Sequence, residues 1–397
     1  LTDMRKRWLR IIVPIVAVLA IGAIAFALLA PSASANDNKY DPAFYATPSP
    51  LPSGAPGTIV RSETMAAPFE GSQAWRVMYL STSWDGSPIV VTGMIFAPTG
   101  TAPTGGRPVV SWSHPTTGIT DGCAPSRVSQ PYTDVQGLQE FLAKGWVVTA
   151  TDYQGLGTDG AHPYLVGSSE ARGTIDIVRA ARLLPGVDAS SRYAVFGHSQ
   201  GGQGVLFAGQ MAPTYAPELQ LVGVAAAAPA GELVELFDAD QNTIAGSVLG
   251  AYAVESWAAV FGYQPSTVVH SNYERRVNDV SKKCVVGGSK LDDLSLGYDA
   301  VILKGRMWKA NPATTPPWSQ QFAINTPGQS SIAAPVLVTQ GDEDKIVRPW
   351  TTPELVATYK ANGTTIQEID LQGVDHMKAG KMSVPYVVPF FAALFAK

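Results

Sequence analysis

The sequence carries little charge, and among its 397 residues only two are cysteine and five are histidine. Charged residues make up 15% of the chain and the formal net charge is −4, with no long run of one sign beyond the first few residues. A nucleic acid or an anionic membrane surface would need a basic patch, which this composition does not provide. With so few thiols and imidazoles, we expect neither a metal site nor a cofactor.

Hydrophobic residues are plentiful, at 46%, which is enough to bury one large core. The chain is longer than a single compact domain needs, so we expect one domain that carries an insertion. The sequence gives no indication of the oligomeric state.

The N-terminus has the pattern of an export signal. Four basic residues within the first ten positions precede an apolar run over residues 11–30, and small residues follow at 33–35. This order predicts a signal segment over residues 1–35 and a secreted mature protein that begins near Asn36. The run is long enough to span a bilayer, so a retained membrane anchor is the alternative. Residues 36–58 are rich in Pro, Ser, Ala and Asn, which predicts a flexible lead-in.

The two cysteines, Cys123 and Cys284, are far apart in the chain. In an exported protein such a pair is expected to form a disulfide. Two separate buried thiols are the alternative.

From residue 59 onward the chain alternates short β-rich runs with helical stretches. The strand candidates are 74–80, 89–96, 108–112, 146–151, 193–196, 221–226, 335–339 and 365–371. The helix candidates are 134–143, 168–184, 201–211, 353–361 and 384–396. Several strand candidates are apolar almost without alternation, as in strands that helices cover on both faces. The pattern predicts an α/β fold with a mostly parallel central sheet flanked by helices.

A long and largely helical segment separates the strand candidates 221–226 and 335–339. It is too long for a simple crossover between neighbouring strands. We therefore interpret residues 231–317 as a helical cap, inserted into a core that consists of residues 59–230 and 318–397.

The pentapeptide Gly-His-Ser-Gln-Gly at 197–201 fits the pattern G-x-S-x-G, and it lies between an apolar strand candidate and a helix candidate. Flanking glycines allow the sharp turn that exposes a serine hydroxyl above a sheet, next to a helix N-terminus. This context predicts Ser199 as a nucleophile and, with it, the α/β-hydrolase fold. The alternative is a glycine-rich turn with an incidental serine.

A serine nucleophile needs a base, and in this fold an acid and then a histidine follow the nucleophile in the chain. Three of the five histidines precede Ser199, and His270 lies in the presumed cap. His376 remains as the candidate base, in a stretch that we predict as a loop after the last strand.

Three carboxylates at positions 342–344 closely follow the strand candidate 335–339, and the acid of a triad lies at the carboxyl end of a strand. We select Asp344, because the run G-x-x-D-x-x-V at 341–347 resembles the acid turn of many α/β-hydrolases. Asp342 is the alternative.

Ester hydrolysis also needs N–H donors for the oxyanion that forms during attack. One is expected to be the backbone N–H of Gln200, which follows the nucleophile, and the other to come from the loop at 114–118. Pro115 lacks an N–H, so Thr116 is our candidate and Thr117 the alternative.

A second motif competes with this interpretation. Residues 155–160 fit G-x-G-x-x-G after the strand candidate 146–151, a pattern of dinucleotide-binding proteins. However, residues 152–154 intervene, Pro163 precedes any helix, and no acidic residue ends a suitable next strand. We therefore do not expect a dinucleotide site.

Several blocks of the sequence, in their order, resemble the secretory lipase family, which is typified by yeast lipase A. These blocks are residues 114–118 with 123–126, residues 152–157 with 162–164, and residues 197–202. The resemblance implies an α/β-hydrolase core with a helical cap, hydrolysis of esters or triacylglycerols, and no metal cofactor. Pro115 stands where a glycine is expected after His114.

The expected activity is therefore hydrolysis of lipid or small-molecule carboxylic esters through an acyl-enzyme on Ser199, with a lipid interface as a further expected partner. Alternatives are a short-chain esterase, an acyltransferase that acts on cell-envelope lipids, a peptidase, and a non-catalytic protein of the same fold. The apolar cap stretch 244–263 has two open interpretations. Either it forms the core of the cap, or Leu249, Tyr252, Trp257 and Phe261 partly line an acyl channel.

Overall fold

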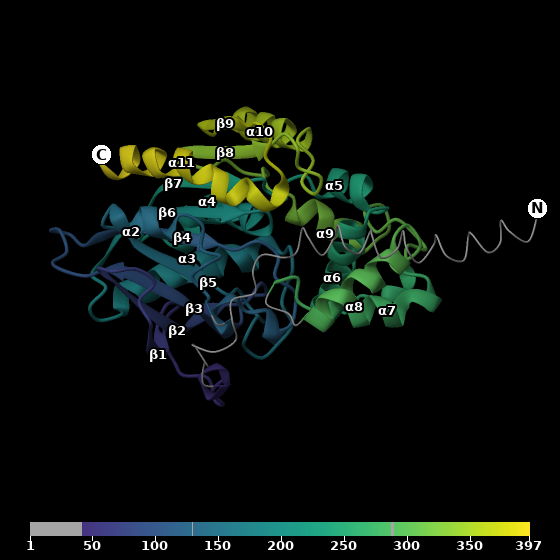
Figure 1. The fold of residues 1–397 in the computed structure, drawn as a ribbon, viewed down its shortest axis with the longest axis horizontal. Coiled ribbons are helices and arrows are strands. Elements are labelled where there is room, and N and C mark those ends of the chain that lie inside the picture. The colour runs from purple at the N-terminus through teal and green to yellow at the C-terminus, as the bar shows by residue number, and fades with distance from the viewer. Residues whose placement is uncertain (1–41, 129, 287–289) are drawn as a thin grey trace, which may run out of the picture.

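A central sheet of nine strands organises the molecule (Figure 1). The computed structural model describes residues 42–128, 130–286 and 290–397, so the predicted signal or anchor segment, residues 1–35, lies outside the described residues. The strand order is β1-β2-β3-β5-β4-β6-β7-β8-β9. The strands are β1 (Ile59–Met65), β2 (Ser72–Thr82), β3 (Pro88–Pro98), β4 (Arg107–Ser113), β5 (Val147–Thr151), β6 (Ala189–His198), β7 (Gln220–Ala227), β8 (Val336–Gly341) and β9 (Ile366–Leu371).

The sheet is parallel from β5 across to β9, and the three strands at the other edge are antiparallel. The core helices are α2 (Leu138–Ala143), α3 (Gly167–Leu183), α4 (Gln200–Tyr215), α10 (Thr351–Ala361) and α11 (His376–Phe395). Helices α3, α4 and α10 pack on one face of the sheet, and α2 and α11 pack on the other. The predicted fold class, a mostly parallel sheet flanked by helices, is confirmed.

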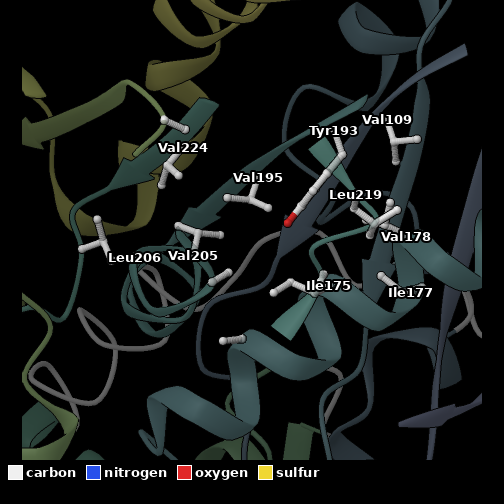
Figure 2. Close-up of a cluster of buried hydrophobic side chains, with 14 of the residues drawn as sticks. Val109, Ile175, Ile177, Val178, Tyr193, Val195, Val205, Leu206, Leu219 and Val224 are labelled. Atoms are coloured by element: carbon white, nitrogen blue, oxygen red, sulfur yellow. The ribbon is translucent and has the colours of Figure 1, made fainter. Parts of the chain in front are cut away.

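Strand β6 packs against helices on both faces of the sheet. Tyr193 and Val195 belong to the hydrophobic cluster with α3 and α4, whereas Ala194 and Phe196 belong to the cluster with α2 and α11. Figure 2 shows the first cluster, in which side chains of the strands meet those of the two helices. Because successive residues of a strand point to opposite faces, a strand covered on both sides is apolar at every position.

A helical cap lies between β7 and β8 and forms a separate part of the molecule in Figure 1. Its helices are α5 (Leu233–Asp240), α6 (Ile244–Phe261), α7 (Ser271–Ser281), α8 (Lys290–Leu303) and α9 (Trp318–Asn325). The helical segment thus continues beyond the predicted end at residue 317. The reason is that Trp318 and Phe322 of α9 pack against Trp257 of α6 in the cap's own core.

Helix α6 covers most of the apolar stretch at 244–263. By length and composition it could cross a membrane. In this structure, however, Val248, Ala251, Val254 and Trp257 are buried in the cap core, and the chain returns to the sheet after the cap. Its apolar character therefore serves packing on several sides.

Part of the segment predicted as a flexible lead-in is anchored on the sheet, although most of residues 46–56 are exposed or half-buried. The side chains of Phe44 and Tyr45, in a short 3₁₀ helix (Pro42–Tyr45), are buried with Met78 and Leu80 of β2. The Tyr45 hydroxyl lies 2.7 Å from Oγ of Ser126. Two aromatic side chains anchor a segment whose composition alone indicates a flexible chain.

Two elements differ from the sequence prediction. Strand β1, at the edge of the sheet, has no buried residue and its sequence is mixed, so it lacks the apolar run that identifies a strand. Helix α11 begins at His376 and not near residue 384, and Pro385 and Pro389 lie inside it. A proline is typical of the first turn of a helix, so Pro385 favours a start just before it, which explains the late predicted start.

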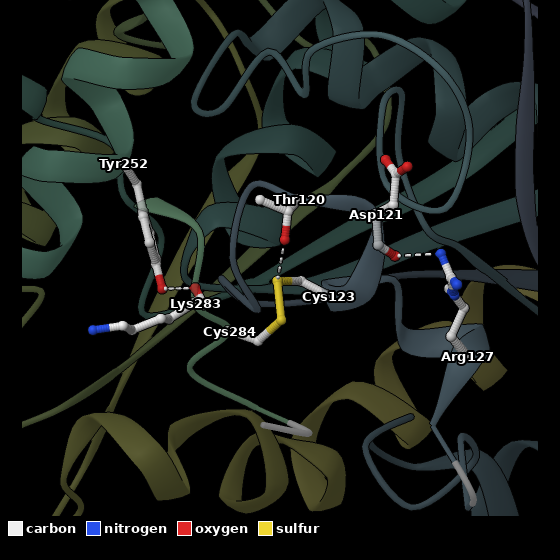
Figure 3. Close-up of a disulfide and its surroundings, with 7 residues drawn as sticks. All are labelled: Thr120, Asp121, Cys123, Arg127, Tyr252, Lys283 and Cys284. Atoms are coloured by element: carbon white, nitrogen blue, oxygen red, sulfur yellow. Dashed lines mark hydrogen bonds between the residues drawn. A yellow bond between two sulfur atoms is a disulfide. The ribbon is translucent and has the colours of Figure 1, made fainter. Parts of the chain in front are cut away.

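A disulfide joins the core to the cap (Figure 3). Cys123 ends a 3₁₀ turn (Asp121–Cys123) in the loop after β4, and Cys284 follows α7. Next to this bond, the backbone N–H of Val285 donates to the carbonyl oxygen of Thr117 at 2.8 Å. The loop that was predicted to supply an oxyanion donor is therefore attached to the cap by two neighbouring bonds.

Candidate active site

Ser199 occupies the turn between β6 and α4. Its backbone angles, φ 59° and ψ −116°, are unfavourable for a residue with a side chain, and 9% of the residue is exposed. The residues two positions before and after Ser199 are glycines by necessity. A Cβ at Gly197 would lie 2.1 Å from the carbonyl oxygen of Gly201, and a Cβ at Gly201 would lie 2.0 Å from that of Ser113. The glycines of the pentapeptide are thus what allows the chain to turn so tightly here.

His376 lies directly against this serine. Its Nε2 is 2.9 Å from Oγ of Ser199, and its Nδ1 is 2.7 Å from Oδ2 of Asp344. The residue is the first of α11, not part of a loop as predicted, and Asp375 caps the helix by accepting the backbone N–H of Lys378 at 3.0 Å. A helix start fixes the imidazole more firmly than a surface loop does.

Asp344 is buried in the turn after β8. One carboxylate oxygen accepts the backbone N–H groups of Ile346 and Val347, at 2.8 and 2.9 Å, while the other faces His376. This arrangement fits an Nδ1–H of His376 that donates to Asp344 and an Nε2 that accepts the Ser199 hydroxyl. Asp342, the alternative, instead accepts the backbone N–H of Gly373 at 2.7 Å. The structure therefore brings Asp344, His376 and Ser199 together in one hydrogen-bonded row.

His198, the residue before the nucleophile, packs against His376, and their ring centroids lie 4.8 Å apart. Burial, and then the nearby His376, holds the pKa of His198 well below its usual value. A neutral His198 supports the ring of His376 without adding a charge beside it.

The predicted oxyanion residues border the same space. Gln200 is the first residue of α4, and Thr116 of the loop after β4 lines one cavity together with Ser199 and Gln200. The Thr116 hydroxyl lies 2.9 Å from the hydroxyl of Tyr164. Before it in the loop, His114 is buried, and burial lowers its pKa to about 4. Whether the backbone N–H groups of Gln200 and Thr116 bind an oxyanion remains a prediction.

A cavity of about 110 Å³ opens above Ser199, between the sheet and the cap. Its lining is mostly aliphatic and aromatic, with Leu165, Leu233, Leu236, Phe237, Leu249, Ala253, Trp257, Phe322 and Val347 among its residues. Of the four side chains predicted for an acyl channel, Leu249 and Trp257 line this cavity. Tyr252 and Phe261 do not, because the Tyr252 hydroxyl donates to the carbonyl of Lys283 and Phe261 packs against Trp84.

One charged side chain, Asp240, also lines the cavity. Burial raises the pKa of its carboxyl, and the guanidinium of Arg348 forms an ion pair with it that acts in the opposite direction. Because Asp240 belongs to α5 and Arg348 follows the acid turn, this pair connects the cap to the segment that carries Asp344.

A second polar group, which the sequence did not predict, lies behind Gln200. Glu170 of α3 and His162 of the preceding loop are fully buried or nearly so, and both contact the side chain of Gln200. In the sequence, Glu170 looks like any exposed glutamate of a helix. The only sign that this region matters was that residues 162–164 belong to a block that resembles the secretory lipase family.

The glycine-rich segment at 155–160 forms turns in the loop before α3, which begins at Gly167. A Cβ at Gly155 would lie 2.5 Å from backbone atoms of Ala161 and His162, so this glycine permits a close backbone contact. Among the described residues, no group of three His, Cys, Asp or Glu side chains could hold a metal ion.

Comparisons with known proteins agree with the sequence motifs. A model of the secretory lipase family matches residues 126–289. A protein named as a probable inactive lipase from Mycobacterium tuberculosis is 23% identical over 378 residues, which cover 90% of this chain and 82% of that protein. Lipase A of Arthroderma benhamiae is 28% identical over 206 residues, covering 46% of this chain and 42% of the fungal protein. This chain therefore matches less than half of that lipase's length.

Among solved structures, lipase A of Candida antarctica in its closed state superposes with a TM-score of 0.73. The sequences are 18% identical, and the match covers 91% of this chain and 87% of that lipase. At this identity the likeness concerns the fold. It confirms the predicted α/β-hydrolase fold.

Proposed function

This chain is related to the secretory lipases, and from that premise we propose that it is a serine hydrolase of carboxylic esters that works through an acyl-enzyme on Ser199. The observation that carries the proposal is the continuous row from Asp344 through His376 to Ser199, with contacts of 2.7 and 2.9 Å. A row of this kind makes a serine hydroxyl nucleophilic, since the histidine accepts its proton during attack.

The proposed reaction has two halves. His376 takes the proton from Oγ of Ser199 as that oxygen attacks the ester carbonyl, and the resulting oxyanion accepts hydrogen bonds from the backbone N–H groups of Gln200 and Thr116. The C–O bond of the ester then breaks, and the alcohol leaves with the proton from His376. A water molecule, deprotonated by His376, releases the acid and restores Ser199.

The cavity supports an ester with an apolar acyl group. Its walls come from both core and cap, and they are predominantly hydrophobic side chains around the nucleophile. We further propose that the protein is exported, because the disulfide between Cys123 and Cys284 needs an oxidising compartment to persist.

Labelling with a fluorophosphonate probe and turnover of p-nitrophenyl esters test the proposal. The wild type should react with the probe and turn over esters, whereas Ser199→Ala should lose the labelling and at least about 10⁴-fold in kcat. Ser271→Ala, at an exposed serine of α7, is the matched control and should behave as the wild type. A folded wild type without labelling or turnover would make this chain a non-catalytic protein, as the name of the mycobacterial relative suggests for that protein.

Acyl transfer to a second alcohol uses the same first half-reaction and differs in the acceptor. Product analysis with and without an added alcohol separates transfer from hydrolysis. Amide substrates tested beside the esters separate a peptidase from both.

A further inference from the structure

Behind the proposed oxyanion residue lies a buried network of three polar side chains. Oε1 of Glu170 accepts Nε2–H of Gln200 at 2.9 Å and the backbone N–H of Leu165 at 3.2 Å. The same amide nitrogen of Gln200 lies 3.2 Å from Nε2 of His162. Glu170 is 0% exposed and Gln200 is 1% exposed, so both side chains need hydrogen-bond partners away from bulk water.

The hydrogen bonds among His162, Gln200 and Glu170 leave two buried oxygens without a donor. Nδ1 of His162 is 2.8 Å from the carbonyl oxygen of Gln154, so this nitrogen carries the proton and Nε2 accepts. Both N–H groups of the Gln200 amide are then used, one toward His162 and one toward Glu170. Two buried oxygens, Oε1 of Gln200 and Oε2 of Glu170, have no hydrogen-bond partner among the described residues.

If Glu170 is ionised, these two oxygens are both acceptors, and neither can satisfy the other. A proton on Oε2 of Glu170 turns that oxygen into a donor, and Oε1 of Gln200 is a buried acceptor that lacks one. Buried polar groups without partners are costly, so the protonated form is the one that the geometry favours.

We propose that Glu170 is a neutral carboxylic acid that positions Gln200, and through it the backbone N–H that follows the nucleophile. This role rests on the proposed function, because it concerns the oxyanion of that reaction. Gln200 is the first residue of α4, where a displacement of the side chain also displaces the turn at Ser199. Glu170 is thus a positioning residue.

The surroundings of Glu170 agree with a neutral acid. The groups that face it are His162, Tyr153 and Tyr164 from the segment between β5 and α3, and Gln200 from α4. In the described part of the chain it has no ion pair with a lysine or arginine, and Arg172 of the same helix binds the carbonyl of Ser83. Burial accordingly raises the pKa of Glu170 to about 8.

Gly204, one turn after Gln200 on α4, provides the space for this acid. A Cβ at Gly204 would lie 3.0 Å from Cβ of Glu170 and 3.1 Å from its Oε2. Helices α3 and α4 approach closely at this point, and the glycine allows a carboxyl group between them.

Glu170→Gln keeps the shape and the hydrogen bonds of the protonated acid but has no proton to lose. At pH 7 its kcat/KM should lie within about twofold of the wild type. From pH 7 to pH 9 the wild type should lose about tenfold, as expected for one group of pKa about 8, and Glu170→Gln should not show this loss. Glu170→Ala should lose at least about tenfold in kcat with a smaller change in KM, because an oxyanion contact acts in the transition state.

Two further measurements do not depend on turnover. The infrared difference spectrum, wild type minus Glu170→Gln at pH 7, should contain the C=O band of a protonated carboxylic acid, because other carboxyls contribute equally to both proteins. The melting temperature of the wild type relative to Glu170→Gln should fall as the pH rises from about 4.5 to about 8, because over this range the folded state holds a proton that the unfolded state has already lost.

Glu140→Gln, at an exposed acid of α2, controls for the loss of a charge and should reproduce the wild type in every measurement. A difference spectrum without this band at pH 7, or a wild-type stability that follows Glu170→Gln at every pH, would overturn the neutral acid. The same alkaline loss in both proteins would overturn the positioning role. If the wild type itself turns over no ester, the proposed function fails and the positioning role falls with it, while the infrared and melting experiments still decide the protonation state.

Discussion

Cys123 and Cys284 are 161 positions apart in the chain, yet their disulfide joins the loop after β4 to the cap just beyond α7. The loop contains Thr116, and its Thr117 carbonyl also accepts the backbone N–H of Val285. The bond therefore restrains the position of the cap relative to the cavity wall. It also closes a very long loop of the unfolded chain.

Removing this bond should destabilise the protein strongly. In the chain-entropy model, a loop of this length corresponds to roughly 4–5 kcal/mol. We expect the double variant Cys123→Ala/Cys284→Ala to unfold at a lower urea concentration than the wild type. Its ester turnover should also be lower than that of the control Ser271→Ala, which should match the wild type. Mass spectrometry of secreted wild type should give a mass about two units below that of the reduced protein, from the loss of two hydrogens. Two freely alkylated thiols in that material would contradict the bond.

The choice of acid can be tested by two matched substitutions. Asp344→Asn should lower kcat by about 10³–10⁴-fold, because an amide no longer holds the Nδ1–H form of His376 and no longer stabilises its cation. Asp342→Asn should stay within a few-fold of the wild type, since Asp342 contacts the backbone of Gly373 and not the histidine. A larger loss for Asp342→Asn than for Asp344→Asn would reverse the assignment.

The cavity makes a prediction about acyl-chain length. Relative kcat/KM should rise from acetate to octanoate esters, with at most about 0.8 kcal/mol for each methylene that becomes buried. Leu249→Phe fills part of the cavity and should lower the octanoate-to-acetate ratio by about tenfold. Phe261→Leu, on the same helix but outside the cavity, should leave the ratio within about twofold. A flat or falling wild-type series, without activity on emulsified triacylglycerol, would indicate a short-chain esterase.

The parts of the site that the sequence predicts are those with a local signature. The glycines around Ser199 are needed by the turn itself, since Cβ atoms at 197 and 201 would meet backbone atoms at about 2 Å. The buried parallel strands are apolar at successive positions, so their number and order along the chain follow from the pattern. The chain order of acid and histidine then leaves few candidates for the other two residues.

What the sequence does not predict depends on contacts between distant segments. Glu170 and His162 are polar residues without a periodic pattern, and their role appears when α3 packs against α4. Pro385 fits the first turn of a helix, so the local rule places the start of α11 too late and misses that His376 begins the helix. Phe44 and Tyr45 likewise become core residues by packing on β2, in a segment whose average composition suggests a free chain.

The three buried histidines 114, 162 and 198 predict that the protein loses stability in mild acid. Burial lowers the pKa of His162 to about 3 and that of His114 to about 4, against 6.5 for a solvent-exposed histidine. The pKa of His198 is lowered as well. Below pH 6.5 the unfolded chain therefore binds protons that the folded chain does not, so the free energy of unfolding falls as the pH falls.

For one such histidine, the loss is at most about 1.4 kcal/mol per pH unit between 6.5 and its folded pKa. Buried carboxyls with raised pKa values, such as Asp152 and Asp176, act in the opposite direction, so a single histidine is best isolated by substitution. His162→Gln should narrow the stability difference between pH 7 and pH 5 by up to about 2 kcal/mol, measured by urea unfolding. His270→Gln, at an exposed histidine of the cap, should leave that difference unchanged. An equal difference in the wild type and His162→Gln would mean that His162 is already protonated or accessible in the folded protein, and the proton count behind Gln200 would then have to be revised.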